Sequence, residues 1–147
     1  MLTRSLSLHF IGYGPNGERL VAGVVPLSAD RSKVLMIQSG GPGGWVLPKG
    51  GWETDEKTAQ DAACREAWEE AGVICTVRRN LGFIPEMRPS SPTASYQFFE
   101  VTVDSEEKNW PEMHKRKRQW VSYAQAASVL TSRPELLEAL NRSSLRR

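Results

Sequence analysis

The chain has few cysteines and histidines, which limits the metal chemistry that it can carry. Its only cysteines are Cys64 and Cys75, and its only histidines are His9 and His114. A zinc cluster needs about four ligands of these two types, so this supply is too small. Two unpaired thiols are compatible with a reducing compartment. We therefore expect a cytoplasmic protein, with the nucleus as a second location.

Long hydrophobic runs are also missing. No apolar stretch approaches the roughly 18 residues that a membrane-spanning helix needs. The first residues, MLTRSLSLHF, lack the apolar core of a secretory signal. We therefore expect no membrane partner. A length of 147 residues, of which 39% are hydrophobic, predicts one domain over residues 1–147 with a core of its own.

The most informative segment covers residues 45–72, where a glycine turn precedes a predicted helix. On this helix Glu66, Glu69 and Glu70 fall within about 100° of one another, so three carboxylates share one face. Like charges this close repel one another unless cations lie between them. Oxygen ligands without a Cys or His cluster suit Mg²⁺ or Mn²⁺. The pattern predicts a divalent-metal site that handles phosphate. The alternative is an exposed acidic helix end, although acids there oppose the helix macrodipole.

The neighbours of these carboxylates favour a site. Arg65 precedes Glu69 by one helical turn, so the two side chains can pair. Gly50 and Gly51 precede the helix, and glycine lets the backbone approach a ligand closely, so a carbonyl from this turn could become a metal ligand. Small side chains lie within about 60° of Glu66 on the helical wheel and leave room for a loop or ligand: Ala59, Ala62 and Ala63.

The run GWETDEKTAQDAACREAWEEAGV closely resembles the Nudix box, at residues 51–73. That motif is Gly, five residues, Glu, seven residues, then Arg-Glu-aliphatic-any-Glu-Glu-any-Gly-aliphatic. One position departs from it, because the first Glu of the motif falls on Lys57. The adjacent Glu56 fits only if the count starts at Gly50, with one extra residue before Arg65. The matching residues are Gly51, Arg65, Glu66, Ala67, Glu69, Glu70, Gly72 and Val73.

The resemblance implies a Nudix hydrolase, an enzyme with an α/β/α sandwich around a central mixed sheet. It implies that Glu66, Glu69 and Glu70 hold one to three Mg²⁺ or Mn²⁺ ions, together with a carbonyl of Gly50 or Gly51. Glu69, Glu70 and Arg65 would then act in catalysis. Glu69 is our choice for the group that takes the proton of the attacking water or holds a second metal.

Alternating patterns predict the order of strands and helices. We expect strands at residues 20–27, 34–38, 76–79, 82–85, 95–103 and 115–121. We expect helices at residues 55–71, 122–130 and 134–141, with Ser122 as a cap and Pro134 in a first turn. The tail over residues 142–147 is expected to fray.

A basic run, HKRKRQW at residues 114–120, is the second functional signal. In a strand, Arg116, Arg118 and Trp120 would point the same way, and two guanidinium groups on one face form a phosphate clamp. A solvated edge strand and a nuclear localisation patch are the alternatives. Residues 53–70 hold seven acids against Lys57 and Arg65, a charge of −5, so a net charge of +2 leaves +7 elsewhere. An acidic patch in a basic domain suits a polyanionic substrate.

The segment RKRQW is similar to the RKREW-type segment of diphosphoinositol polyphosphate phosphohydrolases, and WVLPKGGWE looks most like their fungal members. This resemblance implies small polyphosphate substrates: diphosphoinositol polyphosphates, diadenosine penta- and hexaphosphates and inorganic polyphosphate. It implies phosphate contacts from Arg19, Ser39, Lys49, Arg88, Arg116 and Arg133.

Two other functions compete with this interpretation. ADP-ribose hydrolases of the superfamily carry a proline beyond the box, which Pro89 satisfies loosely, whereas the tyrosine of dinucleoside tetraphosphate hydrolases has no match because Tyr96 lies too far along. A catalytically silent phosphate- or RNA-binding Nudix module is the second alternative. Only 8% of the residues are aromatic and no stacking motif is present, so we expect no nucleic-acid partner. A monomer and a homodimer are both compatible with the sequence.

Overall fold

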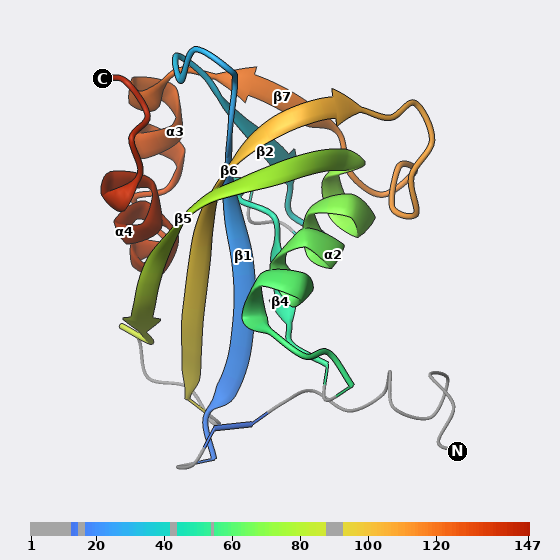
Figure 1. Ribbon diagram of the computed structural model, residues 1–147. Coiled ribbons are helices and arrows are strands. Elements are labelled where there is room, and N and C mark those ends of the chain that lie inside the picture. Colours follow the sequence, from blue (N-terminus) through green and yellow to red (C-terminus); the bar gives the residue numbers. More distant parts are fainter. Residues whose placement is uncertain (1–12, 15–16, 42–43, 54, 88–92) are drawn as a thin grey trace.

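The structure, a computed structural model, describes residues 13–14, 17–41, 44–53, 55–87 and 93–147 (Figure 1). Strands form one sheet in the order β3-β2-β1-β6-β5, with β4 paired to β1 and β7 paired to β2. β1 and β6 are parallel along the whole of β1, and the other pairs are antiparallel, so the sheet is mixed. The strands are β1 (Arg19–Leu27), β2 (Val34–Gln38), β3 (Trp45–Val46), β4 (Lys49–Gly51), β5 (Val73–Pro85), β6 (Ala94–Glu106) and β7 (Arg118–Val121).

Among the described residues, three helices cover the two faces of this sheet. α2 (Ala59–Ala71) lies on one side, while α3 (Tyr123–Val129) and α4 (Pro134–Arg142) lie on the other (Figure 1). The predicted sandwich with a central mixed sheet is confirmed. One face of α2 is lined with fully buried alanines, whose small side chains let the helix backbone lie close to β1 and β4: Ala62, Ala63, Ala67 and Ala71.

The box helix begins four residues later than the sequence predicts. Thr58 is its N-cap and accepts a hydrogen bond from the Asp61 N–H at 3.0 Å. The preceding residues form a turn in which the Glu56 N–H donates to the Glu53 carbonyl at 3.0 Å. This turn points Glu56 toward the helix, and it becomes important at the site. At the other end Gly72 has φ 66°, the left-handed conformation typical of a glycine C-cap.

Three of the predicted strands are wrong in extent. The segments predicted at residues 76–79 and 82–85 are parts of one strand, β5, whose register against β6 shifts at three irregularities. The strand predicted at residues 115–121 begins only at Arg118. The N–H groups of Lys115 and Arg116 both donate to the Glu112 carbonyl, at 2.9 and 3.1 Å, so the chain turns there. Arg116 and Arg118 therefore do not share one strand face.

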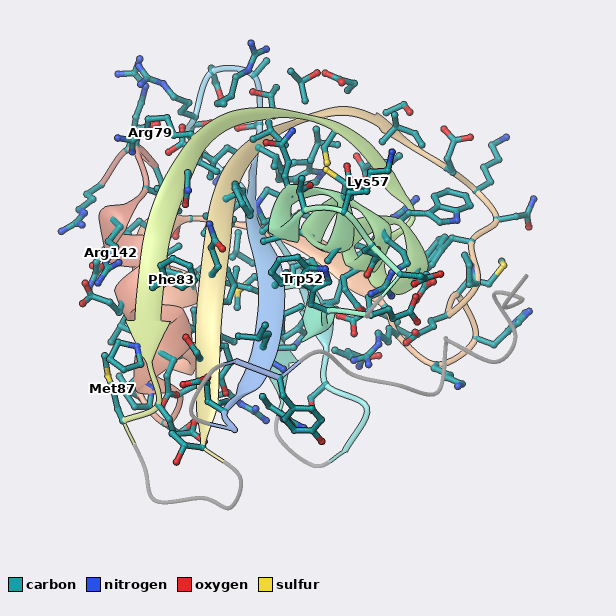
Figure 2. The ribbon with its side chains drawn as sticks, turned by 60° about the horizontal axis from the view of Figure 1, so that its bottom comes forward. Trp52, Lys57, Arg79, Phe83, Met87 and Arg142 are labelled. Carbon is teal, nitrogen blue, oxygen red and sulfur yellow. The ribbon has the colours of Figure 1, made fainter. Side chains whose placement is uncertain are left out.

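β5 is the edge strand of the sheet, and α4 covers part of that edge. The Nη1 group of Arg142 donates to the carbonyls of Leu81 and Phe83, at 3.0 Å each. Figure 2 shows Arg142 beside β5 near Phe83. The Arg142 guanidinium therefore donates hydrogen bonds to two backbone carbonyls of the edge strand.

The tail over residues 142–147 does not fray, which corrects the prediction. The Ser144 N–H and hydroxyl both donate to Glu100, at 2.7 Å each, and Leu145 is buried. The Arg146 N–H donates to the Arg31 carbonyl at 2.8 Å. These bonds attach the tail to β6 and to the β1–β2 turn. In the described part of the chain no helix is long and apolar enough to cross a membrane, and Cys64 and Cys75 are free thiols.

Glu100 tests whether this attachment stabilises the fold. Burial would raise the pKa of this carboxyl group, but hydrogen bonds from Ser144 and Arg79 outweigh burial and hold the pKa below its ordinary value. A lowered folded-state pKa stabilises the protein at neutral pH, and the contribution is lost as the pH falls through that pKa. We expect Glu100→Gln to reduce the free energy of unfolding at pH 7 by about 1.5–3 kcal/mol.

Urea titrations from neutral to acidic pH measure this effect. The gap between wild type and Glu100→Gln should narrow below about pH 4, near the ordinary pKa of a glutamate. Ser144→Ala, which removes one donor and keeps the charge, should cost less. A gap of constant size across the pH range would show that the charge of Glu100 is not its cause.

Candidate active site

The three box carboxylates lie near the C-terminal end of α2, as the helical spacing predicts. Glu66 and Glu70 are buried, at 7% and 9% exposure, and face β4. The side chain of Glu69 is 36% exposed. A Cβ atom at Gly50 would overlap the Glu66 carboxylate, so the end of this side chain occupies the space that the glycine leaves open at β4. The Lys49 N–H also donates to Glu70 Oε1 at 3.1 Å, which fixes β4 against both buried acids.

Burial disfavours the charged form of Glu66 and Glu70 and so raises the pKa of both carboxyl groups. It raises the pKa of Glu66 to about 7, with Arg65 opposing the rise and Glu70 and Glu69 adding to it. Burial also raises the pKa of Glu70, against Arg116 and Lys49. Two buried acids with raised pKa values therefore lie within one helical turn, an arrangement that a bound cation would stabilise.

Arg65 supplies part of that positive charge. Its guanidinium donates to Glu66 Oε2 at 2.9 Å, to Glu69 Oε1 at 3.2 Å and to the Gly51 carbonyl at 2.9 Å. The predicted pair between Arg65 and Glu69 is confirmed. The Gly51 carbonyl is thereby occupied, which leaves Gly50 as the better candidate for a carbonyl ligand.

Glu56 is the outer partner of Arg65, and Lys57 is not. Glu56 accepts two bonds from the guanidinium, at 2.9 and 3.0 Å, and Glu53 lies 3.6 Å from it. These contacts outweigh burial and raise the pKa of Arg65 above its ordinary value. Lys57 is exposed. The departure from the box motif is therefore a one-residue shift in the turn before α2, and the acid–arginine pair itself is present.

The donor set fits a hard divalent cation. It consists of three carboxylates and a glycine backbone, which the Glu66 carboxylate approaches closely. Within the described residues, no three Asp, Glu, His or Cys side chains converge as a ready metal site. The reason is visible in the contacts, because the Arg65 guanidinium lies between Glu66 and Glu69 and bonds to both. Arg65 bonds to one oxygen of each carboxylate, so a bound cation would use the other oxygens.

Two of the predicted phosphate-binding residues, Lys49 and Arg116, lie at these carboxylates, and a third, Arg133, interacts with Lys49 through its charge. Burial lowers the pKa of Lys49, while Glu70 and Glu66 oppose the change and Arg133 and Arg116 add to it. Lys49, Arg116 and Arg133 are thus close enough to interact through their charges. Arg116 Nη2 also lies 3.6 Å from Glu70 Oε2.

Arg116 is held more firmly than a free phosphate clamp would be. Its guanidinium donates to Glu112 at 2.8 Å and to the Gln38 carbonyl at 2.7 Å, and its side chain is 16% exposed. These bonds place it beside the loop that follows β2, because a Cβ atom at Gly40 would lie 3.5 Å from Arg116 Nη2. Ser39 precedes Gly40 in the same loop, and its hydroxyl accepts a bond from the Gly41 N–H at 3.3 Å.

The remaining predicted residues are not brought into this cluster. Arg19 is exposed at the first residue of β1. Strand alternation puts it on the same face as Gly23, the register partner of Lys49, but about 13 Å along the strand. Arg88 lies outside the described residues.

Sequence reasoning missed the group that holds the end of the catalytic helix. Arg118 donates to the carbonyls of Ala71 and Glu107, at 2.8 Å each, and stacks over the Trp110 ring at 4.1 Å. The Trp110 indole N–H donates to the Glu70 carbonyl at 3.2 Å, and the Glu112 N–H donates to the Glu69 carbonyl at 3.1 Å. α2 has no basic residue in its last turn, so β7 supplies the cation that a helix C-terminus favours. The absence of such a cation in the helix sequence is the only signal that could have pointed to Arg118.

Comparison with known proteins identifies the family. The sequence profile of the NUDIX domain family matches residues 17–142. Nudix hydrolase 18, mitochondrial, of Arabidopsis thaliana is 38% identical over 120 residues, covering 75% of this chain and 68% of the relative. Nudix hydrolase 4 of the same plant is 34% identical over 128 residues, covering 80% of this chain and 61% of the relative. The chain belongs to the Nudix family. The matched part of the chain corresponds to about two thirds of the length of these relatives.

Solved structures show the same fold. A NUDIX hydrolase from Nitrosomonas europaea has a TM-score of 0.70 and 19% identity, covering 85% of this chain and 87% of that one. A C. elegans Ap4A hydrolase has a TM-score of 0.63 and 20% identity, covering 84% and 93%. These structures confirm the fold, and the family profile and the plant relatives confirm the assignment as a Nudix hydrolase. The narrower resemblance to diphosphoinositol polyphosphate phosphohydrolases and the cytoplasmic location stay predictions.

The contact between Glu56 and Arg65 yields a direct test of the shifted box. We expect Glu56→Ala to reduce turnover about 10- to 100-fold, because a freed Arg65 no longer orients Glu66 and Glu69. Lys57→Ala, at the position that the unshifted motif assigns to Glu, should change turnover less than about twofold. Turnover on the best substrate of a polyphosphate panel gives the measurement. A larger loss in Lys57→Ala than in Glu56→Ala would contradict this assignment.

Arg118 gives a second test, this time of the support for the helix end. Arg118→Met keeps an apolar contact with Trp110 but leaves the Ala71 and Glu107 carbonyls without their donor. We expect a loss of about 1–3 kcal/mol in the free energy of unfolding and a lower turnover at unchanged KM. Lys117→Met removes the same charge from the neighbouring exposed residue and should change neither quantity. Equal effects of the two variants would assign the result to surface charge.

Proposed function

We propose that this Nudix hydrolase cleaves a phosphoanhydride bond in a polyphosphorylated small molecule, with Mg²⁺ or Mn²⁺ as cofactor. Diphosphoinositol polyphosphates and diadenosine penta- and hexaphosphates are the preferred candidates, and inorganic polyphosphate is the third. One observation supports this proposal above the others: Lys49 and Arg116 lie beside the buried acid Glu70, and Arg133 is close enough to Lys49 for their charges to interact.

The cations of this cluster differ in how free they are. Lys49 is half-buried beside the acids, and Arg116 is bonded to Glu112 and to the β2 end. By contrast, the guanidinium of Arg133 has no hydrogen bond or ion pair with any residue that the structure describes. It stands at the N-cap of α4 and caps no N–H group. Arg133 is therefore the cation best placed to take a phosphate group of the substrate.

The carboxylates carry the metal part of the proposal. Glu66, Glu69 and Glu70, with the Gly50 or Gly51 carbonyl, would hold one to three ions. When bound, such ions neutralise phosphate oxygens and lower the pKa of the attacking water. Arg65 keeps Glu66 and Glu69 oriented through its two bonds. Glu69 is the most exposed of the three acids, which suits the group that receives a proton from water.

A narrower substrate such as ADP-ribose is the competing proposal. ADP-ribose has only two phosphate groups and therefore needs fewer phosphate contacts. The proline that is typical of ADP-ribose hydrolases would be Pro89, which lies outside the described residues. A silent binding module is disfavoured because all three box carboxylates lie on one helix face at β4. The number of phosphates on the preferred substrate therefore distinguishes the two hydrolase proposals.

Arg133→Met tests whether the cluster recognises a phosphate chain. We expect KM for diadenosine hexaphosphate to rise about tenfold or more, because one charge-assisted bond to phosphate is lost. KM for ADP-ribose should change less than about threefold, since attraction in a cleft scales with the charge of the ligand. Raising the salt concentration should narrow the gap by screening its exposed part. Parallel kinetics on both substrates with Mg²⁺ measure the ratio.

Two control variants separate binding from chemistry. Lys33→Met removes an exposed cation in the β1–β2 turn and should leave both KM values unchanged. Glu70→Gln should lower turnover on both substrates by about two orders of magnitude or more while the fold stays intact, because a proposed metal ligand is lost at constant volume. Equal KM ratios for the two substrates in Arg133→Met would overturn the clamp and favour ADP-ribose. Unchanged turnover in Glu70→Gln would remove this carboxylate from the mechanism.

A further inference from the structure

A second basic site lies away from the box carboxylates. A hollow of about 540 Å³ opens where β5, β6, the β1–β2 turn and the C-terminal tail meet. Leu27, at its edge, is four residues beyond Gly23, or about 13 Å along β1. None of its lining residues belongs to the metal or phosphate cluster. Its polar lining consists of Arg31, Arg78, Arg79, Glu100, Thr102 and Ser144.

The charge of this hollow is positive and only partly balanced. Three guanidinium groups face a single carboxylate, Glu100. That carboxylate is buried and already accepts bonds from Ser144 and, at 3.2 Å, from Arg79 Nη2. Figure 2 shows Arg79 on β5, on the side away from Trp52. Glu100 therefore balances Arg79, and the charges of Arg31 and Arg78 are left over.

Arg31 has a backbone conformation that an arginine does not favour. Its φ is 62°, the only positive value among the described residues other than glycine. The conformation is fixed on both sides, because the Arg31 N–H donates to the Ser28 carbonyl at 2.9 Å and its carbonyl accepts from Arg146. Glycine would suit this turn better. The side chain makes no hydrogen bond or ion pair within the described residues, so fold stability gives no reason for an arginine here.

Arg78 is aimed by one neutral contact. Its Nε group donates to the Thr102 hydroxyl at 2.9 Å, and its Nη groups have no described partner. A planar guanidinium with free N–H groups matches the oxygen geometry of phosphate. Two such groups, Arg31 and Arg78, therefore leave guanidinium N–H groups at this hollow that no acceptor among the described residues takes.

We propose that this hollow binds a small phosphate-bearing anion, a phosphomonoester or a short polyphosphate, at a site separate from the hydrolytic one. Its volume is within the usual range for a small-molecule site. The cations surround one hollow and do not form a stripe across the surface, which favours a compact anion over a nucleic-acid strand. The proposal does not depend on which substrate the enzyme hydrolyses.

Amide NMR with metal-free tripolyphosphate as the probe tests the second site. Amides of Ala29, Arg31 and Ser144 should shift with a saturating curve of their own, separate from the curve of Lys49 and Gly50. Arg31→Gly removes the cation and suits the backbone, so this variant keeps its fold. We expect Arg31→Gly and Arg78→Gln to weaken tripolyphosphate binding, read at Ser144, about tenfold or more. Turnover at the hydrolytic site should not change.

Lys33→Gln is the matched control, because it removes one charge from the same turn outside the hollow. It should weaken binding less than about twofold. Inorganic phosphate in place of tripolyphosphate separates a phosphomonoester site, with similar affinities for both, from a polyphosphate site with a clear preference. No shift at Ser144 up to millimolar probe, or equal weakening by Lys33→Gln and Arg31→Gly, would overturn the proposal. Tighter binding of a short single-stranded oligonucleotide, with shifts beyond the hollow, would also overturn it.

Discussion

Three carboxylates within one turn at the C-terminal end of α2 must be balanced by positive charge, and much of the surrounding structure does this. The acids repel one another, two of them are buried, and the helix dipole opposes all three. Arg65 bonds to Glu66 and Glu69 from within the helix. Arg116 approaches Glu70 from the segment before β7, and Arg118 bonds to the carbonyls at the helix end. Divalent metal ions would satisfy the same need for positive charge at this site.

The same requirement connects distant parts of the chain. The turn before α2 contributes Glu56, which holds Arg65. The connection between β6 and β7 contributes Trp110 and Glu112, each of which donates to a backbone carbonyl of a box glutamate. Segments on both sides of α2 in the sequence therefore help to position the box glutamates. This explains why a short motif can fix a site only inside a complete domain.

Sequence reasoning placed the elements whose signals are local. The 100° spacing of the glutamates, the Ser122 cap and the start of β2 at Val34 all follow from neighbouring residues, and the structure has them. The sequence-based predictions were wrong where contacts between distant residues determine the local structure. Lys115 and Arg116 carry a strand-like pattern, but both bond to the Glu112 carbonyl and turn instead. The tail looked free because its partner, Glu100, lies more than forty residues away. Likewise, no local feature of Arg118 shows that it contacts the end of α2.

Arg142 covers part of the β5 edge, and this affects how two copies of the protein could associate. A long edge strand offers a row of unpaired groups to which another chain can add a strand. Here the Arg142 guanidinium holds the Leu81 and Phe83 carbonyls, and Glu138 holds that guanidinium from one turn earlier in α4, at 2.8 Å. Strand addition at this point would first have to displace a charged side chain that is already paired. Addition of a strand from a second copy of this chain is therefore disfavoured at this part of β5.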